Sequence, residues 1–344
     1  MSDKTGIEWT EATWNPLTGC TKVSAGCDHC YAETIAHRFA GTPAYPNGFQ
    51  VTLRPERLDQ PLRWRRPRRI FVNSMSDLFH DAVPDDYIAR VFAVMALAEH
   101  HTFQVLTKRH ARMRSLLRDD DFRQEVGANL IALTADDKGM CVLPEQCLVP
   151  GDWWPLRNVW LGVSTETQQW ADIRIPALLD TPAAVRFISA EPLLGPIYLA
   201  HRGYFASDEF DRTGIDWVIV GGESGRGARP MHPDWARSLR DECQAAGVAF
   251  LFKQWGEWVE DVTERPGDDF GPAYRVLNVP RDAKDRNRCA LHERGMTALT
   301  PDNPFNPFAE GHPGWTAAKR VGKKAAGREL DGRTWDQYPE AVTV

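Results

Sequence analysis

The sequence predicts an α/β fold: a parallel sheet or a partial (β/α) barrel of about six to seven parallel strands. Short apolar runs rich in Val, Ile and Phe alternate with amphipathic stretches whose apolar residues recur at helical spacing. Such runs suit strands that are covered on both faces. A chain of 344 residues with 42% hydrophobic residues can bury the large core that this fold needs. Periodicity alone does not separate an open doubly wound sheet from a barrel.

The expected elements follow one another along the chain, beginning with a strand near Trp14. The later strands are expected within 68–77, 102–110, 158–166, 185–194, 216–225 and 248–258. Helices are expected at 85–100, 111–119, 168–180 and 232–247. Repeated strand-to-helix units of this kind predict one barrel domain over residues 1–258.

Three stretches interrupt the alternation. Residues 41–69 are rich in Pro and Arg, residues 127–157 contain a Trp pair, and the tail from 259 is rich in Gly and Pro with little periodicity. We interpret the first two as insertions in the barrel. Residues 259–344 are expected to form an irregular C-terminal cap packed on the barrel.

The charge and the N-terminal sequence restrict the class of protein. A formal charge of -6 and a pI near 6.0 disfavour a general nucleic-acid coat and leave only local basic patches for such contacts. Residues 1–10 lack a signal-peptide pattern, and no run of eighteen apolar residues occurs, so we expect a cytoplasmic protein without membrane contact. In that compartment the seven cysteines stay reduced, which favours metal binding or catalysis over disulfides.

Three of these cysteines, Cys20, Cys27 and Cys30, form a C-x6-C-x2-C pattern in one loop. Three thiolates can hold three irons of a cubane and leave the fourth iron open for a ligand. A structural zinc site would need a fourth ligand, for which His37 and His80 are the candidates. Gly and Asp residues in the loop make inert core thiols the weakest alternative. The remaining pair, Cys141 and Cys147, could hold a second metal or simply lie in a surface loop.

Polar residues recur where the expected strands end, which is where parallel α/β folds place their sites. Each one alone could be a helix cap or a solvated loop residue. The set is Ser74, Ser76, Asp77, Lys108, Ser164, Glu166, Glu191, Glu223, Lys253 and Gln254.

Several long motifs resemble a known family. “IEWTEATWNPLTGCTKVSAGCDHCYAE”, “NVWLGVSTE”, “FISAEPLLGPI”, “VIVGGESG” and “KQWGEW” are similar to the phage-associated three-Cys-motif family, an uncharacterised group carried by bacteriophages and bacteria. The cysteine loop and the strand-helix series behind it also resemble the radical SAM superfamily. “FQVLTKRHARM” resembles a third-strand segment of its spore photoproduct lyase branch.

The resemblance implies a radical SAM-like barrel in which Cys20, Cys27 and Cys30 hold a [4Fe-4S] cluster. The open iron of that cluster would chelate S-adenosylmethionine, whose reductive cleavage gives a 5′-deoxyadenosyl radical that abstracts hydrogen from a substrate. The loop departs from the usual C-x3-C-x2-C spacing. His29 stands where an aromatic residue usually packs on the adenine.

The resemblance also assigns cofactor-binding positions. “NSMSD” stands where the superfamily has its glycine-glycine-glutamate element, so Ser74, Ser76 and Asp77 are the residues carried over. Gly221, Gly222 and Glu223 lie where contacts to adenine and ribose are common, although a tight turn explains the glycines equally well. Ser164 joins this group as a strand-end residue.

The expected catalytic residues are Glu166, Glu191, Lys108 and Lys253. The carboxylates are candidates for contacts to the cosubstrate or substrate, and the lysines for contacts to a carboxylate or phosphate. Glu191 precedes Pro192, which favours extended backbone there.

The expected partners are a nucleic acid or nucleotide substrate and a reductase or flavodoxin-type electron donor. Basic residues mixed with Trp in 54–69 and 315–333 could contact phosphates and bases, but solvated or internally paired arginines explain them equally well. The alternative function is a binding module, stabilised by zinc or an iron-sulfur cluster, that recognises nucleic acid or protein without radical chemistry. The sequence leaves the oligomeric state open.

Overall fold

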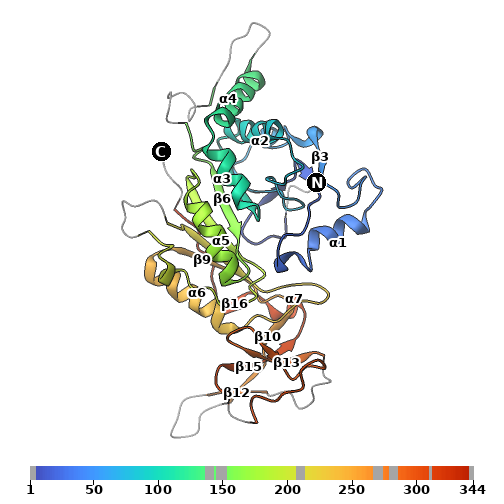
Figure 1. Ribbon diagram of the computed structural model, residues 1–344, viewed down its shortest axis with the longest axis vertical. Helices are drawn as coiled ribbons and strands as arrows, with labels where there is room; N and C mark the ends of the chain where they lie inside the picture. Colours follow the sequence, from blue (N-terminus) through green and yellow to red (C-terminus); the bar gives the residue numbers. More distant parts are fainter. Residues whose placement is uncertain are drawn as a thin grey trace.

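The computed structural model describes residues 5–135, 143–144, 153–206, 214–265, 274–278, 286–309 and 312–340. A seven-stranded parallel sheet forms its centre, and neighbouring strands follow one another in chain order (Figure 1). The strands are β1 (Ala12–Trp14), β4 (Arg69–Val72), β5 (Thr102–Thr107), β6 (Val159–Ser164), β7 (Val185–Ala190), β8 (Trp217–Gly221) and β9 (Ala249–Gln254). The sheet curls into a half-barrel with β1 and β9 at its two edges, which confirms the predicted parallel partial barrel.

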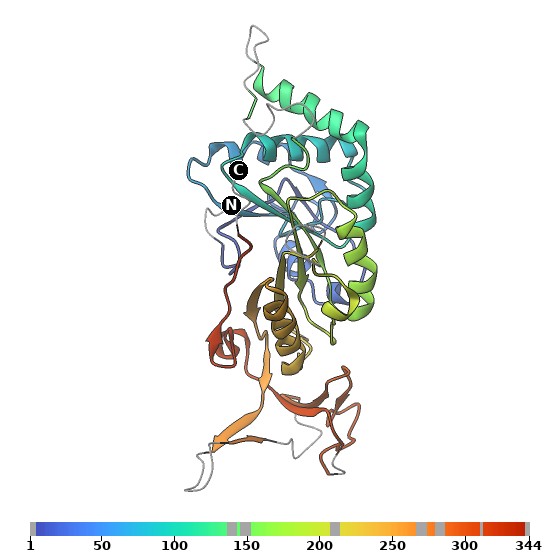
Figure 2. The ribbon, with the colours of Figure 1, turned by 90° about the vertical axis from the view of Figure 1, so that its left-hand side faces the viewer.

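Helices lie on the outer face of this sheet (Figure 2). They are α2 (Asp85–Leu97), α3 (His110–Arg118), α4 (Asp120–Thr134), α5 (Gln168–Leu179) and α6 (Pro233–Ala246), of which α4 packs on α2. Helix α1 (Tyr31–Arg38) follows the cysteine loop, and the short α7 (Lys323–Ala326) lies in the C-terminal region. The helices predicted at 85–100, 111–119, 168–180 and 232–247 correspond to α2, α3, α5 and α6. The sequence analysis did not predict α4, which begins directly after α3 because the Asp119 carboxylate accepts a hydrogen bond from the Asp121 N–H.

Each central strand buries both of its faces, as the apolar runs indicated. In β8, Val218 and Val220 pack with the helices, whereas Trp217 and Ile219 join a second cluster on the opposite face. Period-2 alternation of side chains thus divides one apolar run between two cores. The second cluster is rich in large rings, and it contains Trp9, Phe71, Trp160, Val185, Phe187, Trp217, Ile219 and Leu251.

The end of the chain covers the free edge of the half-barrel. The Phe252 N–H in β9 donates to the Trp335 carbonyl at 3.0 Å, and the Gln337 N–H donates to the Phe250 carbonyl at 3.2 Å. Tyr338 then packs on Trp217 with 5.2 Å between ring centroids. Residues near the C-terminus are therefore part of the barrel core.

The described part of the tail after β9 contains short antiparallel strands, which its weak periodicity did not predict. A four-stranded sheet, ordered β10-β15-β13-β14, projects beyond the end of the barrel (Figure 2). Its strands are β10 (Trp258–Glu260), β13 (Arg288–His292), β14 (Thr297–Ala298) and β15 (Trp315–Arg320). Two-stranded pairs are β2 (Leu17–Thr18) with β3 (Thr52–Leu53), β11 (Val262–Arg265) with β12 (Tyr274–Leu277), and β16 (Glu329–Leu330) with β17 (Arg333–Thr334).

The two expected insertions differ in the structure. Residues 41–69 contribute β3 and lie against the start of the barrel, where β3 pairs with β2. The expected insertion at 127–157 begins inside α4, so its first eight residues, to Thr134, are helical. Cys141 and Cys147 lie outside the described residues. None of the helices in the described ranges has the length and apolar character needed to cross a bilayer.

Candidate functional site

The cysteine loop lies at the carboxyl ends of the first strands. Its start is fixed because the Gly19 N–H donates to the Met75 carbonyl at 3.0 Å, just beyond β4. Cys27 ends a short 3-10 turn, and Cys30 is the residue that precedes α1. Cys20, Cys27 and Cys30 are free thiols with partly exposed side chains. The three cysteine thiols that are expected to bind metal are thus partly accessible at this end of the barrel.

The number of cysteines in the loop suits either a cubane with one open iron or a zinc ion that has a fourth ligand. Within the described residues, no group of three His, Cys, Asp or Glu side chains is arranged to hold a metal ion. Burial, with smaller contributions from Asp77 and Cys27, raises the pKa of the Cys20 thiol to about 11 against the lowering effect of Arg109.

Glu166, which follows β6, holds one side of the loop. Its side chain has 0% exposure, and its Oε2 pairs with Arg174 Nη1 at 2.9 Å. The Ser24 hydroxyl donates to Oε1 at 2.7 Å, and Lys108 Nζ lies 3.5 Å from the same oxygen. A Cβ on Gly26 would lie 2.4 Å from Oε1, so only glycine permits this approach. Both oxygens thus have protein partners, whereas the sequence analysis expected a contact to cosubstrate or substrate.

Glu223, which follows β8, holds the other side of the loop through Arg229. Arg229 Nη2 lies 2.6 Å from Glu223 Oε1, and its Nε donates to Oε2 at 2.9 Å. His29 Nδ1 lies 3.1 Å from Oε2. Burial alone would raise the pKa of Glu223, but the hydrogen bonds from Arg229 and His29 hold that pKa below its usual value.

Glu191, which follows β7, has a more accessible carboxylate. Its side chain is 17% exposed and pairs with Lys253 Nζ at 2.8 Å. Gln254 Nε2 donates to Oε1 at 3.0 Å. A Cβ on Gly221 would lie 3.1 Å from Oε1, which explains a glycine at the end of β8. Burial, Cys30 and Glu191 raise the pKa of Tyr31, the first residue of α1.

The polar side chains that follow β4 make their hydrogen bonds mainly with other groups of the protein. Ser76 donates to the Leu17 carbonyl at 2.9 Å, and Ser74 exchanges a hydrogen bond with Asn15. Asp77 accepts from the Thr107 hydroxyl at 2.7 Å and from the Lys108 N–H at 3.0 Å. These contacts fix the turn from which the cysteine loop starts.

Three buried side chains at the strand ends carry polar atoms that have no hydrogen-bond partner among the described residues. They are both amide atoms of Asn73, the hydroxyl of Thr165 and Oε1 of Gln254, at the ends of β4, β6 and β9. Asn73 has a left-handed backbone with φ of 62°. Buried polar atoms elsewhere among the described residues, such as Trp9 Nε1 and Gln60 Oε1, also have no hydrogen-bond partner, so this property is shared by other parts of the protein.

Sequence reasoning missed Asn73, Arg174 and Arg229. Asn73 had a usable signal, because it directly follows the apolar run of β4. Arg174 lies in α5, where an arginine has no special pattern, and yet its side chain has 0% exposure. Arg229 contacts Glu223 and also residues about 200 positions earlier, which no local pattern encodes.

The two basic segments are largely paired within the protein. Arg54 donates to the Pro43 and Ala44 carbonyls, and Arg63 pairs with Asp59. In the second segment Arg320 lies 3.5 Å from Glu257. Exposed basic side chains include Arg65, Arg66, Lys323 and Lys324.

Two cavities lie away from the cysteine loop. One of about 370 Å³ lies near the start of β7 and is lined by Arg118, Arg123, Trp154 and Arg186, among others. Another of about 840 Å³ lies on the C-terminal sheet and is lined by His292, Met296, Phe305 and Trp315, among others. Neither includes a residue that the sequence assigned to the site.

Comparison with known proteins identifies a family without an assigned activity. A family model described as “Protein of unknown function (DUF5131)” matches residues 4–339. No curated protein shows a significant match to the chain. The family description does not mention bacteriophages, so the predicted phage association stays a prediction.

Solved structures of spore photoproduct lyase match the chain at low sequence identity and low TM-score. A double-mutant enzyme with bound AdoMet and dinucleoside spore photoproduct is 10% identical, with a TM-score of 0.32, over 77% of this chain and 68% of that chain. A single-mutant enzyme with the dinucleoside photoproduct is 12% identical, with a TM-score of 0.32, over 76% of this chain and 66% of that chain. This chain therefore spans about two thirds of the length of those structures.

Proposed function

The chain belongs to the DUF5131 family of proteins of unknown function, and we propose that it is a radical SAM-like iron-sulfur enzyme that acts on a nucleic acid or nucleotide. The observation that carries the proposal is the set of three free, partly exposed thiols in one loop at the carboxyl ends of a parallel half-barrel. Three thiolates are the ligand number that leaves one iron of a cubane open. The resemblance of the motifs around them to the radical SAM superfamily supports the same assignment.

Cys20, Cys27 and Cys30 would hold the cluster. When bound, such a cluster supplies one electron for the reductive cleavage of S-adenosylmethionine to methionine and a 5′-deoxyadenosyl radical. An external reductase or flavodoxin-type protein would deliver that electron. The 5′-deoxyadenosyl radical would take a hydrogen atom from the substrate, which would give 5′-deoxyadenosine and a substrate radical.

Residues of this chain would bind and orient the cosubstrate. Glu191 offers a partly exposed carboxylate for an ammonium or ribose hydroxyl, and Lys253 offers a cation for a carboxylate or phosphate. Asn73, Thr165 and Gln254 have buried polar atoms for further hydrogen bonds. Burial of these groups strengthens their contacts with a bound ligand and excludes water.

The proposed substrate class, a nucleic acid or nucleotide, is based on exposed basic side chains. Exposed basic residues such as Arg65, Arg66, Lys323 and Lys324 suit phosphate contacts. The protein would then use local patches, since its overall charge is -6.

The proposal is tested by reconstituting the purified protein with iron and sulfide under anaerobic conditions. We expect about four irons per chain, a visible absorption band, and 5′-deoxyadenosine on addition of S-adenosylmethionine and a reductant. Cys27→Ala should abolish the cluster, whereas Cys243→Ala should retain it because Cys243 is buried in the core. Unchanged iron content in Cys27→Ala would remove the assignment.

The second candidate function is a zinc-stabilised binding module. Zinc would need a fourth ligand, and His80 is a candidate because its Nε2 lies 2.9 Å from the Thr21 hydroxyl, next to Cys20. Colourless protein with one tightly bound zinc after the same reconstitution would favour this function over the first.

A further inference from the structure

Two polar clamps hold the cysteine loop to the half-barrel. The first is Ser24 on the buried Glu166 carboxylate, described above. The second is Arg229, which bridges Glu223 to two points of the loop: its Nη2 donates to the Ala25 carbonyl at 2.8 Å, and its Nη1 lies 3.2 Å from Asp28 Oδ2. Ala25 and Asp28 flank Cys27 in the chain. The Arg229 guanidinium therefore contacts the segment that carries Cys27 on both sides of that cysteine.

Arg229 is itself positioned by the C-terminal antiparallel sheet. Trp258 in β10 donates from Nε1 to the Ala228 carbonyl at 2.7 Å, directly before Arg229. Arg320 in β15 donates to the Gly225 carbonyl at 3.2 Å. Ala228 and Trp258 also share a small apolar cluster with Cys289 and Ala318. The segment after β8 thus lies between the cysteine loop and this sheet, and contacts both.

We propose that Arg229 is a positioning residue for the cysteine loop, and that the C-terminal sheet acts on the loop through it. Glu166 and Glu223 then serve as anchors of the loop rather than as ligand contacts. This inference deepens the proposed function and rests on it for one point, namely that the group bound by the cysteines is an iron-sulfur cluster. The position of the loop is a property of the protein alone.

The geometry suits arginine and no other side chain. A guanidinium presents donors in a fixed planar fork, so it can contact a carboxylate on one edge and a carbonyl on another. Lysine keeps the charge but has all its donors on one nitrogen, so it cannot reproduce the separate contacts of Arg229 Nε, Nη1 and Nη2. Glutamine removes the charge and leaves Glu223 with fewer partners. The three side chains give a graded series at one position.

The first experiment uses the full-length, metal-free protein. Hydrogen-deuterium exchange and alkylation of the loop thiols are measured in wild type, Arg229→Lys and Arg229→Gln. We expect amides of residues 24–30 to exchange about tenfold faster in Arg229→Gln, with an intermediate rate in Arg229→Lys, because local opening governs exchange. Unchanged exchange and unchanged thiol reactivity in Arg229→Gln would overturn the inference.

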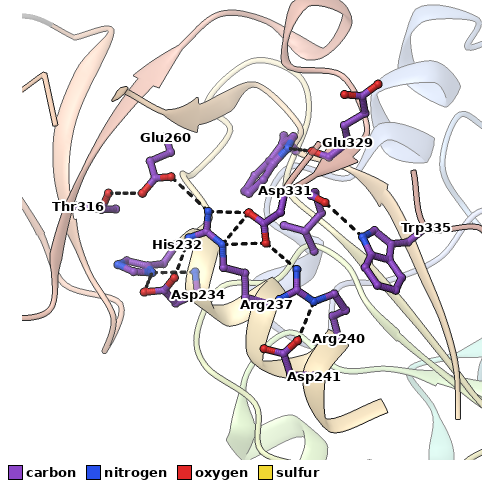
Figure 3. A network of polar contacts seen from close by, with 12 residues as sticks. His232, Asp234, Arg237, Arg240, Asp241, Glu260, Thr316, Glu329, Asp331 and Trp335 are labelled. Carbon is purple, nitrogen blue, oxygen red and sulfur yellow. Dashed lines mark hydrogen bonds and ion pairs between the residues drawn. The ribbon is translucent and has the colours of Figure 1, made fainter. Parts of the chain in front are cut away.

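Arg240 in α6 provides a matched control (Figure 3). It makes comparable ion pairs, with Asp331 at 2.6 Å and Asp241 at 2.8 Å, but neither partner belongs to the four-stranded C-terminal sheet or to the cysteine loop. Arg240→Gln should change overall stability without a selective effect on residues 24–30. Equal acceleration in both variants would mean that Arg229 acts only through global stability, and would also overturn the inference.

The contribution of the C-terminal sheet is tested with Trp258→Phe, which removes the hydrogen bond to Ala228 and keeps an aromatic ring in place. Exchange in 24–30 should accelerate by less than in Arg229→Gln, and the double variant should match Arg229→Gln alone if both act through one path. If the accelerations of exchange caused by Trp258→Phe and Arg229→Gln add in the double variant, the C-terminal sheet does not act on the loop through Arg229.

The cluster gives a separate readout. In reconstituted protein, Arg229→Gln should lose iron to a chelator several-fold faster than wild type and should alter the electron paramagnetic resonance spectrum of the reduced cluster. If wild type binds no iron at all, the proposed function fails while the exchange and alkylation results still decide the role of Arg229.

Discussion

The ends of β6 and β7 lie side by side in the sheet, and each is followed by a glutamate, but the two carboxylates have different surroundings. Glu166 after β6 has 0% exposure and pairs with an arginine that is equally buried. Glu191 after β7 is 17% exposed and pairs with a lysine of similar exposure. Equivalent places in the strand pattern thus lead to an internal anchor in one case and an accessible charge in the other. The position of each glutamate after its strand places it at the same end of the barrel. Its ion-pair partner and its burial then decide whether its carboxylate is an internal anchor or an accessible charge.

The largest expected effect is loss of stability in Glu166→Ala. The change leaves Arg174 as a buried charge without its carboxylate, which costs about 3–5 kcal/mol of unfolding free energy. Chemical denaturation of the metal-free protein measures it. Lys108→Met is the matched control, because Lys108 Nζ is 3.5 Å from Glu166 and 20% exposed, so its loss should cost about 1 kcal/mol or less. Similar costs for both variants would contradict a buried Glu166–Arg174 pair.

A smaller effect is expected from Glu191→Gln. The change removes charge at nearly constant volume, so the fold and the iron content should stay as in wild type. We expect about tenfold weaker S-adenosylmethionine binding by titration calorimetry, equal to about 1.4 kcal/mol. Glu260→Gln is the control, since Glu260 is 15% exposed and lies on the C-terminal sheet. Wild-type affinity in Glu191→Gln would leave Glu191 as a structural residue at the barrel end.

The smallest effect concerns pH and Glu223. Its pKa is below the usual value in the folded protein, so the unfolded chain binds more protons in acid and stability falls as pH falls through the lowered pKa. The contribution is complete above the ordinary carboxyl pKa. Denaturation of metal-free protein between pH 6 and about pH 3 should show a shallower loss in Glu223→Gln than in wild type. Identical slopes would mean that Arg229 and His29 do not stabilise the charged form.

Much of the half-barrel could be predicted from the sequence, because strands buried on both faces need continuous apolar runs. Strand β8 was predicted from the apolar run in “DWVIVGGESG”, and its alternate residues face two different cores. Local spacing likewise identified Cys20, Cys27 and Cys30 as one group, since all three lie in one short loop. The C-terminal antiparallel sheet was not predicted, because its strands are only two to six residues long and β13 pairs with β15 across a long separation.

The sequence by itself determined which residue types stand at the carboxyl ends of the strands, because parallel strands bring those ends to one side whatever the packing. Only the tertiary structure decided which carboxylates stay accessible. Glu166 and Glu223 are held by Arg174 and Arg229, and each pair depends on where a helix or a distant loop comes to lie. Burial and ion pairing are properties of the packed chain, so no local pattern could separate these two residues from Glu191.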